Sequence, residues 1–184
     1  MKKVYTKIFS ITLIAILSVM LLLPYSVNAA TVEDSAVQPR WYDPTGSWPG
    51  YLFLTLDNAT SSWNHGHAGI GGDNGQTIEA YGGVGVRIYS NGYNTNWKDC
   101  TTGGIYRVNG ATTSQYETAK NYAYSKVGTP YSTNLLDGES TFYCSELVYK
   151  AWKEAGITIG TNVLGLITPN SIMNHNNTIL VYSF

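Results

Sequence analysis

The stretch FYCSELVYKAWKEAG, residues 142–156, determines how the rest of the chain is interpreted. It predicts an amphipathic helix, because its apolar residues recur every three or four positions and Gly156 follows as a stop signal. The apolar residues of this face are Leu147, Val148, Ala151, Trp152 and Ala155. Cys144 falls in the first turn, where free backbone N–H groups and the helix dipole stabilise a thiolate. Cys144 is therefore a candidate nucleophile, although a buried packing cysteine or half of a disulfide fits the same position.

A nucleophilic cysteine needs a base, and the chain contains three histidines, His65, His67 and His175. His67 begins the segment HAGIG, residues 67–71, which predicts a short strand. Side chains alternate along a strand, so His67 points away from the face on which its neighbour Ala68 packs. His67 is the candidate base.

A histidine base works best when a polar group orients its second nitrogen. The segment TIEAY, residues 77–81, follows HAGIG after the tight loop GDNGQ, so the two segments predict an antiparallel pair. A loop of three or five residues sets Glu79 opposite His67, whereas an even loop pairs His67 with Ala80 and sends Glu79 to the other face. Glu79 is the candidate orienting group, and a solvated strand residue is the alternative.

Further short strands and two more helices complete the expected fold. The strand candidates are YLFLTL (51–56), HAGIG, TIEAY, VGVRIY (84–89), GIYRV (104–108) and TILVYSF (178–184). Ser114 and Glu117 form a capping box for a helix that stops at Gly128, and Thr168 followed by Pro169 predicts a short last helix. Because helices and antiparallel strands occur in separate runs, the sequence predicts an α+β domain.

The first residues have the pattern of a secretory signal peptide. The charged start MKKVYTK precedes an apolar run and then a small-residue cleavage site, V-x-A. We expect cleavage after Ala29 or Ala30, and a retained membrane anchor is the alternative. The expected parts of the chain are a signal peptide at 1–29, a flexible segment at 30–47 and one domain at 48–184.

Charge limits the partners that we expect for the mature chain. Cleavage removes three lysines, so Lys plus Arg falls from 11 to 8 against 12 Asp plus Glu, and the net charge is near −4. A nucleic-acid binder would show a basic stripe, and the sequence has none. We therefore expect a secreted protein with no nucleic-acid partner and no stable membrane insertion after cleavage.

Two alternatives compete with thiol chemistry. Cys100 and Cys144 are the only cysteines, and a disulfide between them would make the protein a non-catalytic secreted binding module. His65 and His67 share a strand face and offer two ligands for zinc, with one or two more from His175, Cys144 or an Asp, and this alternative is a metal-dependent hydrolase. Only the H-G-H spacing supports a metal, so we expect neither a metal nor another cofactor.

Two segments resemble the permuted branch of the NlpC-type papain-like cysteine peptidases, which includes relatives of lecithin retinol acyltransferase. VGTPYSTNLLDGESTFYCSELVYKAWKEAGI (127–157) is similar to the helix, the G-x-P-Y loop and the nucleophile helix of that family, and HAGIGGDNGQTIEA (67–80) to its histidine strand and the next strand. The cysteine helix comes first in the ordinary family, whereas here it comes second. The resemblance covers roughly residues 48–184 and implies a papain-like antiparallel sheet packed against the nucleophile helix.

The resemblance also implies the chemistry. Cys144 would be the nucleophile, His67 the base and Glu79 the group that holds the imidazole, in a secreted thiol hydrolase that cleaves an amide, or an ester, through a thioester. Two departures leave the substrate open between a cell-wall peptide and a lipid-like acyl amide. The peptidases often read D-C-S-G where this chain reads Y-C-S-E, and the transferases usually have a second histidine where Glu79 stands.

The oxyanion that forms during acyl transfer needs hydrogen-bond donors close to the sulfur. We expect the backbone N–H of Cys144 to be one of them. The side-chain candidates for oxyanion or substrate contact are Tyr51, Tyr143 and Ser145.

Overall fold

A computed structural model describes residues 46–57, 66–93, 97–134, 138–162 and 164–184. The predicted signal peptide, most of the predicted flexible segment and His65 lie outside these residues. All the described residues belong to one compact unit. Among them, no helix has the length and apolar character needed to cross a membrane.

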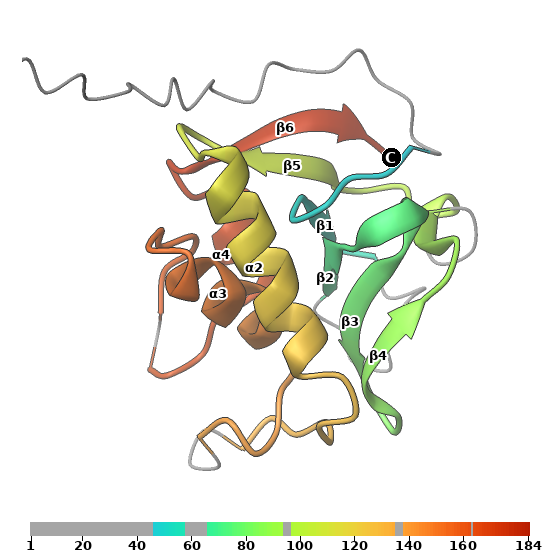
Figure 1. The fold of residues 1–184 in the computed structure, drawn as a ribbon, viewed down its shortest axis with the longest axis vertical. Helices are drawn as coiled ribbons and strands as arrows, with labels where there is room; N and C mark the ends of the chain where they lie inside the picture. Colours follow the sequence, from blue (N-terminus) through green and yellow to red (C-terminus); the bar gives the residue numbers. More distant parts are fainter. Residues whose placement is uncertain (1–45, 58–65, 94–96, 135–137, 163) are drawn as a thin grey trace, which may run out of the picture. The chain divides into compact units, whose positions relative to one another are not determined.

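Six antiparallel strands form a single sheet in the order β4-β3-β2-β1-β5-β6 (Figure 1). The strands are β1 (Leu52–Thr55), β2 (His67–Gly71), β3 (Thr77–Tyr81), β4 (Gly85–Tyr89), β5 (Gly104–Val108) and β6 (Thr178–Ser183). Each of the six lies inside a segment for which the sequence predicts a strand. The last strand pairs with β5, the strand before it in the sequence, and forms one edge of the sheet.

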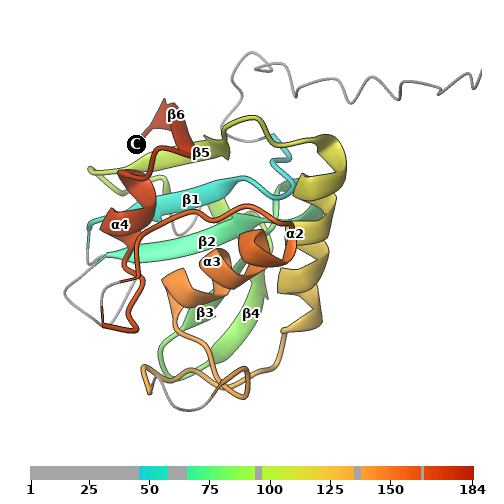
Figure 2. The same ribbon diagram turned by 90° about the vertical axis from the view of Figure 1, so that its left-hand side faces the viewer.

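Within the described residues, three α-helices pack against the sheet from the same side (Figures 1 and 2). They are α2 (Thr113–Ser125), α3 (Cys144–Glu154) and α4 (Pro169–Met173). Helix α3 contacts β2 and β3, and α4 contacts β1 and β6. The predicted α+β fold, with an antiparallel sheet packed against the cysteine helix, is confirmed.

The first of these helices begins earlier than its predicted cap. Thr112, not Ser114, is the N-cap residue of α2: its hydroxyl accepts from the backbone N–H of Gln115, whose side chain accepts from the N–H of Thr112 in return. The two overlapping motifs both satisfy the capping pattern, and the one with the extended backbone forms the cap. Glu117 instead forms an ion pair with Lys120.

Strands β1 and β2 are buried on both faces. Phe53 and His67 contact the ring of Trp97, with centroid distances of 5.6 and 5.2 Å. Alternation directs their neighbours Leu54 and Ala68 to the opposite face, which the helices cover (Figure 2). His67 therefore points away from the helical face, as the sequence predicts, but into an aromatic layer rather than into solvent.

Helix α3 is fixed at its C-terminal half by Trp152. This side chain is fully buried, its ring makes an edge contact with Tyr116 of α2, and its indole N–H donates to the carbonyl oxygen of Gly50 at 3.2 Å. Because Gly50 directly precedes β1, the hydrogen bond ties the helix to the sheet. The contact of α3 with β2 then places the first turn of the helix beside the histidine strand.

Candidate active site

Cys144 opens helix α3. The preceding residue, Tyr143, has extended backbone and caps the helix without a side-chain hydrogen bond, so the N–H groups of the first turn remain available to the sulfur. Burial alone would raise the pKa of the Cys144 thiol, but the hydrogen bond and charge of His67, with the N–H groups of Ala68 and Ser145, lower it below its ordinary value. The surroundings therefore favour the thiolate.

His67 is held between aromatic rings and is 1% exposed. Trp97 stacks on one face of its ring, and Tyr81 makes an edge contact at 5.8 Å. Burial alone would lower the pKa of His67, but the hydrogen bonds and charges of Cys144 and Glu79 outweigh it and raise the pKa to about 9. The environment thus stabilises an imidazolium beside a thiolate.

The ladder between β2 and β3 ends close to the position where Cys144 and His67 meet. In the described part of the chain, the ladder between β2 and β3 consists of two pairs, Ile70–Ile78 and Gly71–Thr77. Beyond these pairs, toward the start of β2, the N–H of Ala68 has no partner on β3 and serves the sulfur of Cys144 instead. The gap between the strands lets the helix terminus reach the histidine on β2.

Glu79 lies on the same face as His67, but the predicted pairing is wrong in register. Five residues, 72–76, connect β2 to β3, and the observed register continues to place Glu79 opposite Gly69. A Cβ added at Gly69 would lie 3.7 Å from the Cβ of Glu79, which confirms the proximity. A five-residue loop moves Glu79 two residues along β2 compared with a three-residue loop, so its carboxylate reaches His67 diagonally.

The carboxylate of Glu79 is fully buried and uses both oxygens. Oε2 accepts from Nε2–H of His67 at 2.8 Å, and Oε1 accepts from Nε–H and Nη2–H of Arg87 at 2.9 and 2.7 Å. Burial alone would raise the pKa of Glu79, but His67 and Arg87 lower it. Because Nε2 is engaged in this way, the buried Nδ1 of His67 is the nitrogen left for the thiol of Cys144.

Tyr143 and Ser145 flank the cysteine but bind a different segment. The hydroxyl of Tyr143 accepts from the backbone N–H of Ile167 at 3.0 Å, and Oγ of Ser145 donates to the carbonyl oxygen of Ile167 at 2.8 Å. Both side chains are buried. They hold the chain that leads into α4 against the start of α3. Ser145 uses its hydroxyl proton in this contact, whereas the Tyr143 hydroxyl acts there as an acceptor.

Tyr51 lies among other aromatic residues. Its ring contacts Trp48 and Tyr116, each with a centroid distance of 5.0 Å. His67 pairs with Thr55 of β1, and Tyr51 precedes Thr55 by four residues, which is about 13 Å along a strand. The expectation that Tyr51 contacts the oxyanion stays a prediction.

The sequence analysis missed Tyr131. Burial raises the pKa of this tyrosine, and the charges of Cys144 and Tyr143 raise it further. A parallel bridge between Tyr131 and Phe142 brings the two segments together. The signal was present in the sequence, because Tyr131 is the tyrosine of the G-x-P-Y loop.

The remaining cysteine and histidine lie elsewhere. Cys100 and Cys144 are both free thiols, so the structure does not contain the disulfide of the binding-module alternative. Burial raises the pKa of the Cys100 thiol, the opposite of the shift at Cys144. His175 follows α4, where its Nδ1 accepts from the N–H of Asn177. Within the described residues, no three His, Cys, Asp or Glu side chains are grouped to hold a metal ion.

The fold and the order of its parts define a class: an antiparallel sheet with a histidine strand that precedes a cysteine helix is the arrangement of a permuted papain-like enzyme. Comparison with known families agrees. Residues 54–179 match the family described as "Permuted papain-like amidase enzyme, YaeF/YiiX, C92 family". The chain belongs to this C92 family of permuted papain-like amidases, so the resemblance seen in the sequence is confirmed at the level of the superfamily.

Two individual proteins are similar to the chain. "Uncharacterized protein YycO" of Bacillus subtilis (strain 168) is 32% identical over 119 residues, which are 61% of this chain and 46% of YycO. The chain thus spans about half the length of this curated relative. The crystal structure of metalloprotein yiiX from Escherichia coli O157:H7 matches with a TM-score of 0.54 at 14% identity and covers 71% of this chain and 94% of that one. At this identity, the likeness supports the fold alone.

Proposed function

We propose that this protein is an exported thiol amidase in which Cys144, His67 and Glu79 cleave an amide bond through a thioester. One observation carries the proposal: a cysteine with a lowered pKa at a helix start lies beside a buried histidine whose pKa is raised to about 9. Reciprocal shifts of this kind are typical of a nucleophile and its base. Membership of an amidase family supports the reaction class.

The proposed reaction has two halves. The Cys144 sulfur attacks the carbonyl carbon, and His67, which holds the former thiol proton, gives it to the leaving amine as the C–N bond breaks. In the second half, water attacks the thioester, His67 takes the proton from the water, and that proton returns to the sulfur as the C–S bond breaks. The products are an amine and a carboxylic acid. Glu79 keeps the imidazole in place through Nε2 throughout.

The oxyanion would be held at the start of α3. The backbone N–H of Cys144 belongs to the first turn, where the helix dipole favours negative charge. We propose Tyr131 as a further side-chain donor, because its bridge to Phe142 places it beside the residues that lead into α3 and the charge of Cys144 helps to raise its pKa. We propose no metal step. The yiiX protein is titled a metalloprotein, but the described residues of this chain offer no group of three ligands.

The proposed substrates are the amides of cell-wall peptides or fatty-acyl amides, met outside the cell after removal of residues 1–29. The amino-terminal pattern supports export, and the acidic mature chain, with 15 tyrosines and 5 tryptophans in the full sequence, suits peptide, sugar or acyl contacts. The wild-type protein, Cys144→Ala and Cys100→Ala should be incubated with both substrate sets. We expect release of amine by wild type and Cys100→Ala, with an acyl adduct on Cys144 in intact-mass spectra. Equal activity in Cys144→Ala would refute the proposal.

A further inference from the structure

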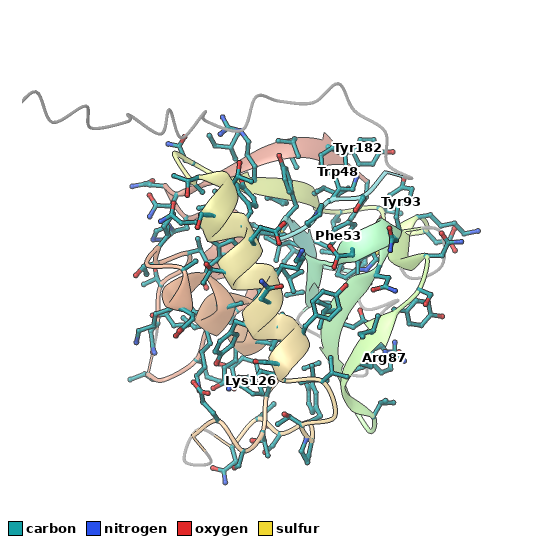
Figure 3. All side chains as sticks on the ribbon, viewed as in Figure 1. Trp48, Phe53, Arg87, Tyr93, Lys126 and Tyr182 are labelled. Carbon is teal, nitrogen blue, oxygen red and sulfur yellow. The ribbon has the colours of Figure 1, made fainter. Side chains whose placement is uncertain are left out.

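Arg87 is the next member of the series of interacting side chains that runs from Cys144 through His67 to Glu79. It lies on β4 at the edge of the sheet, directly opposite Glu79 of β3 in the antiparallel ladder (Figure 3). Two of its N–H groups converge on Oε1 of Glu79, at 2.9 and 2.7 Å. Oε2 of the same carboxylate accepts from His67. The buried carboxylate therefore stands between two cationic partners, one on each oxygen.

Two tyrosines hold the guanidinium in this position. The Cζ atom of Arg87 lies 3.9 Å from the ring centroid of Tyr81 and 4.8 Å from that of Tyr89. Tyr81 also touches the ring of His67. The guanidinium is thus packed into the wall of the site rather than extended into solvent.

This arrangement has a chemical consequence for Glu79. A fully buried carboxylate stays ionised only when its oxygens are hydrogen-bonded or paired with charge, and a second oxygen left bare costs free energy. Arg87 binds Oε1, while Oε2 accepts from Nε2–H of His67. The orientation of the carboxylate and its negative charge therefore depend on Arg87 as well as on His67.

We infer that Arg87 is a positioning residue of the proposed amidase, which keeps Glu79 ionised and aimed at His67 and so supports the thiolate of Cys144. This inference rests on the proposed function. A lysine would supply a point charge without the planar pair of donors or the ring contacts. A purely structural cross-strand ion pair would stabilise the sheet without any effect on the reactivity of the sulfur.

The pH profile of Cys144 alkylation separates these two roles. Iodoacetamide reacts with the thiolate, so the rate of mass gain at Cys144, followed from pH 5 to 10 in Cys100→Ala background, gives the midpoint of thiolate formation. Arg87→Met should raise that midpoint by about one pH unit, the lower end of the range for loss of a nearby opposite charge. Below the midpoint, alkylation should slow roughly tenfold. Arg107→Met, on β5, is the matched control and should leave the profile unchanged.

A double variant tests whether Arg87 acts through Glu79. If it does, Arg87→Met should add nothing to the shift caused by Glu79→Gln. Additive shifts would overturn the inference, as would a wild-type profile in Arg87→Met with only a lower melting temperature. If Arg87→Met does not fold, Arg87→Lys decides the matter: a partial shift with a native melting curve supports the inference, and no shift overturns it. Failure of the proposed function looks different, because wild-type Cys144 would then show no enhanced reactivity at all.

Discussion

Gly69 offers a sharp test of how rigidly the histidine is held. A Cβ built at this position would lie 3.2 Å from Cζ2 of Trp97, slightly inside normal contact. The Trp97 ring is fully buried and is packed against His67, Phe53 and Phe184, so it has little room to retreat. Gly69→Ala should therefore compress the layer that covers the histidine.

The size of the effect follows from two opposing contributions. Overpacking a close-packed interior costs about 1–3 kcal/mol. Replacing glycine by alanine returns about 0.4–1 kcal/mol, because the unfolded chain loses freedom. We expect Gly69→Ala to lower the free energy of unfolding by about 1 kcal/mol, which is about 4 °C in melting temperature for a domain of this size.

Thermal unfolding of Gly69→Ala and Gly71→Ala side by side provides the assay. A Cβ at Gly71 would overlap the carbonyl oxygen of Trp48, which belongs to the backbone and cannot rotate away. Gly71→Ala should thus be much less stable than Gly69→Ala, or should fail to fold. If Gly69→Ala melts at or above the wild-type temperature, Trp97 moves freely and the rigid packing on His67 is refuted.

Two further predictions follow from the site. Ser145→Ala removes the hydroxyl that donates to the buried carbonyl of Ile167, and should lower the free energy of unfolding in denaturant by about 1–3 kcal/mol. Ser125→Ala, at an exposed hydroxyl, is the control, and equal effects would contradict the argument. The rate of amide hydrolysis should fall as the pH rises through about 9, because His67, with its pKa raised to about 9, must be protonated to release the amine. A fall of the rate near pH 6.5, the pKa of an ordinary imidazole, would contradict the pairing of His67 with Cys144.

The strands and the cysteine helix could be predicted from sequence because their signals are local. Short β-prone runs are separated by turn residues, and the apolar face of residues 147–155 matches one side of a helix, so the α+β class follows without long-range information. The helix start at Thr168 could be predicted from Pro169 in the first turn, and the structure adds a capping box between Thr168 and Ser171. The cap of α2 was missed only because two overlapping motifs fit.

The details of the candidate site depend on register and on long connections, which local patterns do not determine. The odd number of residues in the loop after β2 places Glu79 on the same face as His67. Only the observed pairing of Ile70 with Ile78 shows that Glu79 lies diagonal to His67 rather than directly opposite. Trp97 comes from the connection between β4 and β5, where no periodic signal predicts its place. Arg87 was within reach of sequence reasoning, since the short GGV turn between TIEAY and GVRIY sets it opposite Glu79.

The most direct test of the central claim is competitive alkylation of the two thiols. Intact mass and peptide mapping of the mature protein, before and after iodoacetamide near pH 7 without reductant, should show Cys144 reacting much faster than Cys100. In His67→Ala, the pKa of the Cys144 thiol should rise, because the thiolate loses the hydrogen bond and the charge of His67, and its alkylation at pH 7 should slow roughly tenfold for each pH unit of that rise. Equal rates for the two cysteines, no effect of His67→Ala, or an inert protein two mass units light would contradict the account.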